Sequence, residues 1–360
     1  MTAPGRRSDV DVLALFLPQF HPIPENDAWW EPGFTEWTNL AAAQPLFVGH
    51  RRPDLPGELG FYDLRLAEVR ERQAALARDH GVTAFCWWHY WFAGRRLLER
   101  PFDEVLASGS PTLPFSLCWA NQSWSGVWHG APDRVLLEQT YPDGDDEAHF
   151  AALLPAFRDE RYHLVAGRPL LGVFRPQELP DARRFVETFQ RLASEAGLGG
   201  LYLVAFCESR AWGAQYTTHV DDGFDAAVHV EFPFARTART KLRDRLRTSS
   251  ERFGPGRYHY VEDLPVYPRS LRGVVHPCVY PNWDNTPRSA RRGSVIVDAS
   301  PPRFERHVRQ AVGRAALNPE GERLVFVKSW NEWAEGNHLE PDRRHRRAWL
   351  EALAAGLTER

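Results

Sequence analysis

Several features common in other protein classes are missing from this chain of 360 residues. Lysine is nearly absent, since only Lys241 and Lys328 accompany the many arginines. The four cysteines are far apart and form no Cys-x-x-Cys motif, which favours small buried residues in a reducing compartment over a disulfide pair or metal site. No three-histidine or His-x-His pattern predicts a metal either. The first apolar run, residues 12–17, is too short for a signal peptide or membrane span, so a cytoplasmic location is expected.

Charge and complexity exclude further classes. The formal net charge is −3 and the sequence pI is about 6.5, so no global charge favours nucleic acid or an anionic membrane as a partner. We find no internal repeat and no low-complexity segment. The basic stretch at 236–247 predicts a solvated helix face, with a phosphate or acidic-sugar contact as the alternative. No sequence feature specifies an oligomeric state.

Short apolar runs alternate with helical patterns along the whole chain. Strands are expected at residues 10–17, 82–88, 115–119, 170–174, 201–207, 226–230, 274–279 and 324–327. Helices are expected near 62–80, 97–108, 143–158, 181–196, 304–317 and 344–357. This alternation predicts a single (β/α)8 TIM barrel with long βα loops over residues 1–360, with its core at about 10–357. A doubly wound open sheet is the alternative, but no Gly-x-Gly-x-x-Gly follows the first strand.

Aromatic rings crowd the ends of the predicted strands. Thirteen of the fourteen tryptophans lie at a strand end or just after it, and only Trp349 lies on a helix. In a barrel these ends form one rim, where active sites lie. Rings mixed with acids and amides are typical of carbohydrate binding, although small loop cores are the alternative for any single ring. The candidate substrate-binding residues are Gln19, His21, Glu36, Trp37, Trp88, His89, Tyr90, Trp119, Asn121, Glu208, His229, Glu231, Tyr280, Trp283, Asp284, Trp330, Asn331, Trp333 and Glu340.

Glu332 and Glu335 are the candidate catalytic pair. They follow the last predicted strand and are interleaved with Trp330 and Trp333. Glycoside chemistry needs one carboxyl group that holds a proton for the leaving oxygen and a second that acts as base or nucleophile. A spacing of three residues lets both point into a barrel mouth if the segment forms a helical turn, and the indoles would raise one pKa. A surface ion pair or a helix start is the alternative. No metal and no cofactor are predicted.

Long motifs lie in the same places. They are Phe-Leu-Pro-Gln-Phe-His-Pro-Ile-Pro-Glu-Asn-Asp at 16–27, Gly-Phe-Thr-Glu-Trp-Thr-Asn at 33–39, Phe-Cys-Trp-Trp-His-Tyr-Trp-Phe at 85–92, Trp-Ala-Asn at 119–121, Trp-Asp-Asn-Thr-Pro-Arg at 283–288 and Trp-Asn-Glu-Trp-Ala-Glu-Gly at 330–336. With them, roughly residues 12–355 resemble the WbsX-like family of bacterial polysaccharide-cluster proteins, which are labelled glycosyltransferases. That family also resembles glycoside hydrolase family 99, the endo-α-mannosidases, which are (β/α)8 barrels.

The resemblance implies roles for the two glutamates. The hydrolases carry a Glu-Trp-His-Glu-Gly motif at the last strand, which Glu332 and Glu335 match, with Ala334 in place of the histidine. It implies that Glu332 acts as base on the sugar 2-hydroxyl, giving a 1,2-anhydro sugar with retention, and that Glu335 is the acid/base at the glycosidic oxygen. We therefore expect an enzyme that cleaves or transfers α-linked units of a bacterial surface polysaccharide. The alternatives are a glycosyltransferase with an activated donor and a non-catalytic glycan-binding barrel.

Overall fold

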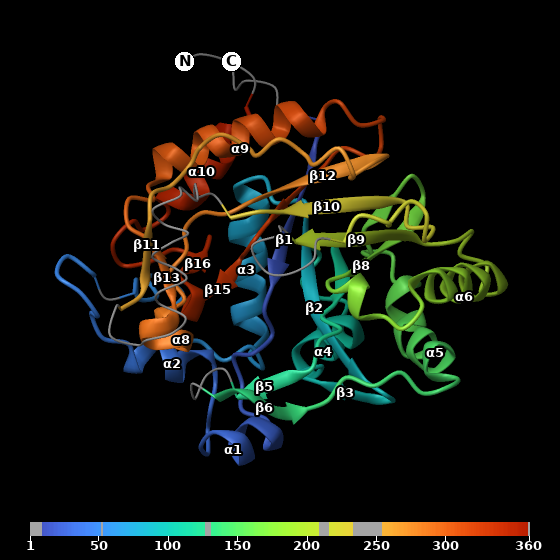
Figure 1. Cartoon of the computed structure of the whole chain (residues 1–360), viewed down its shortest axis with the longest axis horizontal. Coiled ribbons are helices and arrows are strands. Elements are labelled where there is room, and N and C mark those ends of the chain that lie inside the picture. Colours follow the sequence, from blue (N-terminus) through green and yellow to red (C-terminus); the bar gives the residue numbers. More distant parts are fainter. Residues whose placement is uncertain (1–8, 52, 127–130, 209–215, 233–253, 359–360) are drawn as a thin grey trace.

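Eight parallel strands close into a barrel in the computed structural model, which describes residues 9–51, 53–126, 131–208, 216–232 and 254–358 (Figure 1). The barrel strands are β1 (Asp11–Phe16), β2 (Ala84–Phe92), β4 (Phe115–Trp119), β8 (Arg168–Val173), β9 (Tyr202–Glu208), β10 (Ala226–Val230), β12 (Val274–Val279) and β14 (Leu324–Val327). Because β1 pairs with both β14 and β2, the sheet closes on itself. The predicted (β/α)8 barrel is confirmed, and β4, β10, β12 and β14 coincide with their predicted ranges.

Helices cover the outside of the barrel. They are α3 (Ala67–Asp79), α4 (Arg100–Ser108), α5 (Asp145–Phe157), α6 (Ala182–Glu195), α9 (Pro301–Ala315) and α10 (Ala348–Gly356). Helix α6 shows why they form: the Asp181 side chain accepts a hydrogen bond from the backbone nitrogen of Arg184 at 2.9 Å and caps the helix. Phe185 and Phe189, one turn apart, are then buried, Phe185 against Trp119 of β4 and Phe189 against His149 and Phe150 of α5. The predicted helix face at 236–247 lies outside the described residues.

Shorter elements fill the loops, and the sequence predicted none of them except a helical turn at η6. They are α1 (Pro24–Trp29), α2 (Glu36–Ala42), β3 (Arg95–Leu97), β5 (Trp124–Gly126), β6 (Ala131–Leu137), β7 (Leu164–Val165), η2 (Pro176–Glu178), β11 (Gly256–Tyr258), α8 (Thr286–Ser289), η5 (Ala290–Arg292), β13 (Ser294–Ile296), β15 (Asn331–Glu332), η6 (Trp333–Glu335) and β16 (Asn337–His338). Strands β5 and β6 form a hairpin near α1 (Figure 1). The loops at this end therefore have a structure of their own.

Strand β2 shows how side chains divide between the two faces of the barrel wall. Trp87 points outward and lies 5.7 Å from Phe102 of α4, measured between ring centroids. Trp88, the next residue, points inward, with its ring centroid 6.4 Å from that of Phe206. Successive side chains of a strand face opposite sides, so only alternate residues at a strand end reach the barrel mouth.

Three further findings concern the cysteines, membrane-spanning helices and metal sites. All four cysteines are buried and none forms a disulfide, as the sequence predicts. None of the helices in the described part is long and apolar enough to cross a membrane. In the same part of the chain, no group of three or more histidine, cysteine, aspartate or glutamate residues is arranged to hold a metal ion.

Candidate active site

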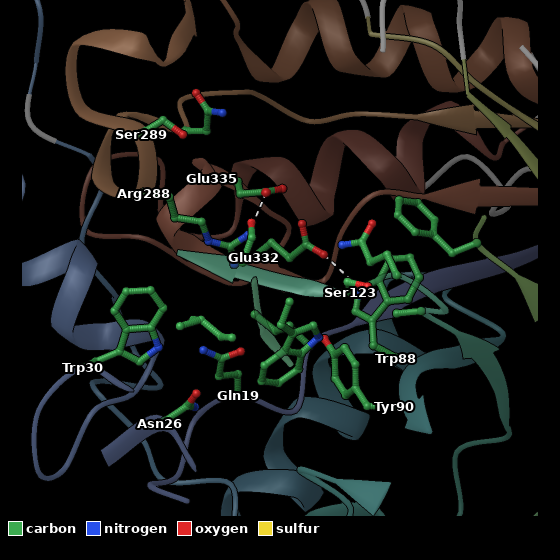
Figure 2. Close-up of a pocket in the computed structure, with 18 of the residues that line it drawn as sticks. Gln19, Asn26, Trp30, Trp88, Tyr90, Ser123, Arg288, Ser289, Glu332 and Glu335 are labelled. Atoms are coloured by element: carbon green, nitrogen blue, oxygen red, sulfur yellow. Dashed lines mark hydrogen bonds and ion pairs between the residues drawn. The ribbon is translucent and has the colours of Figure 1, made fainter. Parts of the chain in front are cut away.

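A pocket of about 380 Å³ lies at the carboxyl ends of the barrel strands (Figure 2). Residues that follow or end β1, β2, β4, β8, β12 and β14 line it, and α1 and the β5–β6 hairpin complete its wall. Both candidate catalytic glutamates, Glu332 and Glu335, lie in it. The site is therefore at the end of the barrel that the sequence predicted.

The two glutamates share one ammonium group. The Nζ atom of Lys328 lies 2.5 Å from Oε2 of Glu332 and 3.1 Å from Oε2 of Glu335, so these two oxygens are at most about 5.6 Å apart. Trp88 donates from Nε1 to Oε1 of Glu332 at 2.8 Å. Arg288 donates from Nη1 to Oε1 of Glu335 at 2.6 Å. Each carboxyl group is thus fixed by two donors.

A tight turn orients the pair. After β14 the chain forms β15, the 3-10 turn η6 and β16, so the predicted helical turn is present. The turn ends at Gly336, whose φ of 59° is left-handed and where an added Cβ would lie 2.8 Å from the backbone nitrogen of Asp284. That nitrogen donates to the carbonyl oxygen of Glu335 at 2.7 Å. The loop after β12 therefore holds in place the turn formed by β15, η6 and β16, which we call the glutamate turn.

A further buried carboxylate lies behind the pair. Arg288 donates from Nη2 to Oε1 of Glu36 at 2.8 Å, and the backbone nitrogen of Ala334 donates to the same oxygen at 2.9 Å. Glu36 is fully buried, and burial raises its pKa. Arg288 thus bridges Glu36 and Glu335 and links α2 to the glutamate turn.

The electrostatics of the two glutamates differ. Burial, together with the charge of Glu335, raises the pKa of Glu332 to about 7. Burial acts on Glu335 as well, but Lys328 and Arg288 outweigh it and hold the pKa of Glu335 well below its usual range. Below about pH 7 the pair therefore holds one proton, and the opposite pKa shifts favour Glu332 as its site. The two carboxylates in turn keep Lys328 charged and raise its pKa in spite of burial.

The structure brings part of the predicted site together. The predicted residues that line the pocket are Gln19, Trp88, Tyr90, Glu332 and Glu335. Glu208 lies nearby, 3.1 Å from Nη2 of Arg175, and burial raises its pKa while Arg175 and Lys328 lower it. Tyr280 is fully buried, the charges of Glu208, Glu332 and Glu335 act on it, and its hydroxyl has no hydrogen-bond partner in the described part of the chain.

Three predicted residues support the wall of the barrel instead of facing the pocket. Nε2 of His89 lies 3.0 Å from Nε2 of His149, under α5. Trp119 packs outward on Phe185, with ring centroids 5.7 Å apart. Asn121 binds the backbone of Arg175 through both its amide atoms, at 2.7 and 2.8 Å.

Another group holds the glutamate turn from behind. Trp330 and Trp333 both donate from their indole nitrogens to Glu340, at 2.9 and 2.6 Å. Asn331 binds the backbone nitrogen and oxygen of Leu17 at 2.7 and 3.0 Å. Trp37 packs on Trp333 with ring centroids 5.8 Å apart. These side chains position the pair without lining the pocket.

The remaining predicted residues lie at a strand end or in the loops, with His229 in β10. Nδ1 of His21 is 3.2 Å from the carbonyl oxygen of Pro18. Nε2 of His229 lies 3.5 Å from Oε2 of Glu231, but burial lowers the pKa of His229 to about 4, so the imidazole is neutral near neutral pH and forms no ion pair there. Trp283 donates from its indole nitrogen to Ser294 at 2.9 Å.

Asp284 organises the loop after β12. Its Oδ1 accepts from the backbone nitrogen and hydroxyl of Thr286, at 3.0 and 2.6 Å. Its Oδ2 lies 3.0 Å from Nε2 of His50. Since Nδ1 of His50 accepts from the backbone nitrogen of Leu46, Nε2 carries the proton and donates to Asp284.

Sequence reasoning missed several residues of the site. Arg288 occurs in a motif and Lys328 lies two residues before one, but neither received a role, and Asn26, Trp30 and Trp124 of the pocket wall were not candidates. One signal was available: Lys328 is one of two lysines in the chain and directly follows the last strand. Arg288 had a weaker signal, as the last residue of the Trp-Asp-Asn-Thr-Pro-Arg motif.

Solved structures share this fold. The GH99 endo-alpha-mannosidase from Bacteroides thetaiotaomicron, in complex with BIS-TRIS-Propane, aligns with a TM-score of 0.58 at 11% identity, covering 98% of this chain and 97% of that chain. A second structure of that enzyme gives a TM-score of 0.56 at 12% identity, with the same coverage. A protein described as a glycoside hydrolase-like protein gives 0.61 at 13% identity, covering 100% of this chain and 98% of its own. At these identities the likeness concerns the fold alone.

Comparisons of the sequence show relatives of much higher identity. Two proteins described as "Uncharacterized protein WxcX", from two strains of Xanthomonas campestris pv. campestris, are each 41% identical over 350 residues, or 96% of this chain. The chain spans about half the length of these curated relatives, 49% of each. The profile of the family described as "Glycosyltransferase WbsX" matches residues 12–353. The chain therefore belongs to the WbsX glycosyltransferase family of carbohydrate-active enzymes.

Proposed function

We propose that this chain is a retaining enzyme that cleaves or transfers α-linked glycosyl units of a bacterial surface polysaccharide. The observation that carries the proposal is the pair of buried glutamates, Glu332 and Glu335, that share the ammonium group of Lys328 in the barrel-mouth pocket. The α-linkage follows the activity named for the endo-alpha-mannosidase of the same fold. The polysaccharide follows from membership of the WbsX family.

The spacing of the two carboxyl groups supports retention. Retaining glycosidases place their carboxyl groups about 5–5.5 Å apart, whereas inverting enzymes leave about 6.5–9.5 Å for a water molecule. The two oxygens on Lys328 are at most about 5.6 Å apart. In the proposed reaction Glu332 removes the proton of the sugar 2-hydroxyl, and that oxygen attacks C1 while Glu335 protonates the departing oxygen. Water or a sugar hydroxyl then attacks C1 from the face that the first leaving group occupied and gives its proton to Glu335. The C1–O2 bond breaks in the same step, and Glu332 returns its proton to O2.

This reaction needs the single proton of the pair on Glu335. In the resting site that proton lies on Glu332, because Lys328 and Arg288 stabilise the charge on Glu335. The two carboxyl groups hydrogen-bond to each other when they share a proton, so the proton has a direct route between them. The total charge of the pair is the same in both arrangements. The proposed roles therefore require a shift of the proton within the pair and no exchange with solvent.

The charge balance of the pocket favours a glycan over an activated nucleotide-sugar donor. Among the described lining residues, the cations are Arg288 and Lys328. Both already contact carboxylates at 2.5–3.1 Å. A diphosphate would have to compete with these carboxylates for its counter-charge.

A panel of defined α-linked oligosaccharides tests the proposal. We expect cleavage, or transfer to an added acceptor sugar, of at least one member, and a first-formed product with the α-configuration by proton NMR. A β-configured first product would contradict the retaining mechanism. Turnover only with nucleotide sugars would establish glycosyl transfer from an activated donor instead.

The pH dependence of activity should report the shared proton. Because the pKa of Glu332 is raised to about 7, the pair loses its last proton as the pH rises through about 7. Above that pH no acid is left for the departing oxygen, so kcat/KM should fall on the alkaline side. The low pKa of Glu335 delays the second protonation, so activity should persist well into the acidic range.

Lys328→Met provides the control for this pH profile. The ammonium group of Lys328 lowers the pKa of both glutamates, so its removal should move the alkaline limb to higher pH as well as reduce the rate. An alkaline limb at the same pH in both proteins would show that another group controls it. The measurement is kcat/KM against pH at constant ionic strength.

A further inference from the structure

The wall of the pocket opposite the glutamates carries buried amides without partners. Asn26 of α1 is completely buried, and neither Oδ1 nor Nδ2 has a hydrogen-bond partner in the described part of the chain. Gln19 is 3% exposed, and its Nε2 also has no partner there. Both residues line the pocket, and Figure 2 shows Gln19 between Asn26 and the glutamate pair. Burying an amide without a partner is unfavourable, so such groups need an explanation.

Aromatic rings lie beside these amides. Trp30, which follows α1, and Trp124, in β5, line the same pocket and are partly exposed. Trp124 is fixed by edge contacts with Tyr90 and Trp29, at centroid distances of 5.1 and 5.7 Å. Trp30 stacks on Phe34 at 5.6 Å. The hairpin and α1 therefore present indole surfaces that are already held in place.

The same wall carries no charge. Apart from Arg288, Lys328 and the two glutamates, every described residue that lines the pocket is uncharged. Gln122, Ser123 and Ser125 add further amide and hydroxyl groups. Uncharged hydrogen-bonding groups beside aromatic faces match the hydroxyls and the apolar faces of a neutral sugar.

We propose that Asn26 and Gln19, with Trp30 and Trp124, form a second sugar subsite that binds the neutral unit next to the one at the glutamates. The amide of Asn26 can accept from one hydroxyl and donate to the neighbouring oxygen, which suits a vicinal diol of a pyranose. This inference rests on the proposed function, because the glutamates define the first subsite. It names the substrate class: a glycan with at least two adjacent uncharged units.

The test compares one and two sugar units in a chain that binds but does not turn over. In the Glu335→Gln background, calorimetry measures binding of neutral α-linked disaccharides and of the matching methyl α-monosaccharides. Asn26→Leu should weaken binding of the disaccharide by about tenfold, the value of one or two hydrogen bonds. It should change binding of the monosaccharide less than about twofold. Gln19→Leu should show the same selectivity.

A matched variant controls for loss of an amide as such. Asn39 of α2 also has a buried Nδ2 without a partner in the described chain, but it does not line the pocket, so Asn39→Leu should leave both affinities unchanged. Asn26→Leu should melt at the same temperature as its parent or higher, because it removes unpaired buried groups.

Different outcomes overturn different claims. Equal loss for both probes, or no loss for the disaccharide, would overturn the subsite. So would binding of UDP or GDP without binding of any neutral probe. If Asn26→Leu selectively weakens disaccharide binding while the wild-type chain turns over no glycan, the subsite is supported and the proposed catalysis is contradicted.

Discussion

Glu335→Gln is expected to cleave an unactivated glycoside about 10²- to 10⁴-fold more slowly than the parent chain, while binding the glycan nearly as well. Glutamine has the size of glutamate and an oxygen that Arg288 or Lys328 can still bind, but it cannot deliver a proton. Loss of the charge also removes the interaction with Glu335 that helps to raise the pKa of Glu332. The measurement is single-turnover cleavage alongside calorimetric binding.

A substrate with a good leaving group separates the roles of the two glutamates. An aryl glycoside with an acidic phenol needs little protonation, so Glu335→Gln should regain much of its rate on that substrate. Glu332→Gln should not, because the attack by the 2-hydroxyl still lacks its base. If Glu332→Gln regains the rate instead, the roles are reversed, as the resting proton on Glu332 would allow.

Glu178→Gln is the matched control for these variants. Glu178 follows β8, is exposed, pairs with Arg175 and does not line the pocket. Its variant should stay within about twofold of the parent rate. Parent-like turnover by Glu335→Gln on unactivated glycosides would rule out the proposed acid/base role.

The barrel could be predicted because its strands are buried on both faces. A parallel barrel strand is covered by helices outside and by core side chains inside, so it reads as a continuous apolar run. Residues 324–327 are such a run, and residues 226–230 are one apart from His229; β14 and β10 occupy those ranges. Amphipathic patterns between the runs, such as that of α6, then completed the fold.

The direction of each side chain at a strand end was harder to predict. Position at the end of β2 made Trp88, His89 and Tyr90 equal candidates, although alternate residues face opposite sides. Trp88 and Tyr90 line the pocket, whereas His89 contacts His149 under α5. Once one of these residues is assigned to the inside of the barrel, the alternation of side-chain directions along the strand predicts from sequence alone which of the others face the pocket.

Partners far apart in sequence could not be predicted in this way. Arg288 contacts Glu36 across 252 residues, and no local pattern joins α8 to α2. Asn26 and Trp124 meet in one wall because α1 and the β5–β6 hairpin pack together, and neither element was predicted. Such contacts depend on how loops settle on a finished barrel, which periodicity does not encode.

Glu340→Leu is expected to lower the free energy of unfolding by about 3–5 kcal/mol. The buried carboxylate accepts from Gln73 and Trp330 at Oε1, at 2.6 and 2.9 Å, and from Tyr62 and Trp333 at Oε2, at 2.8 and 2.6 Å. Leucine fills a similar volume but accepts nothing, so all four donors would lose this acceptor. Urea unfolding followed by tryptophan fluorescence measures the loss.

Glu340→Gln distinguishes hydrogen bonding from charge as the cause. Burial raises the pKa of Glu340 to about 7. A neutral side chain of the same size should therefore lower the free energy of unfolding less there than at an ordinary carboxylate site. Glutamine keeps one acceptor oxygen, so the free energy of unfolding of this variant should lie between those of the parent and the leucine variant. Glu58→Gln, in the exposed pair with Arg347, should cost less than about 1 kcal/mol. Since Trp330 and Trp333 flank the candidate catalytic glutamates, the leucine variant should lose activity as well as stability. A stable, fully active Glu340→Leu chain would show that this cluster does not position the pair.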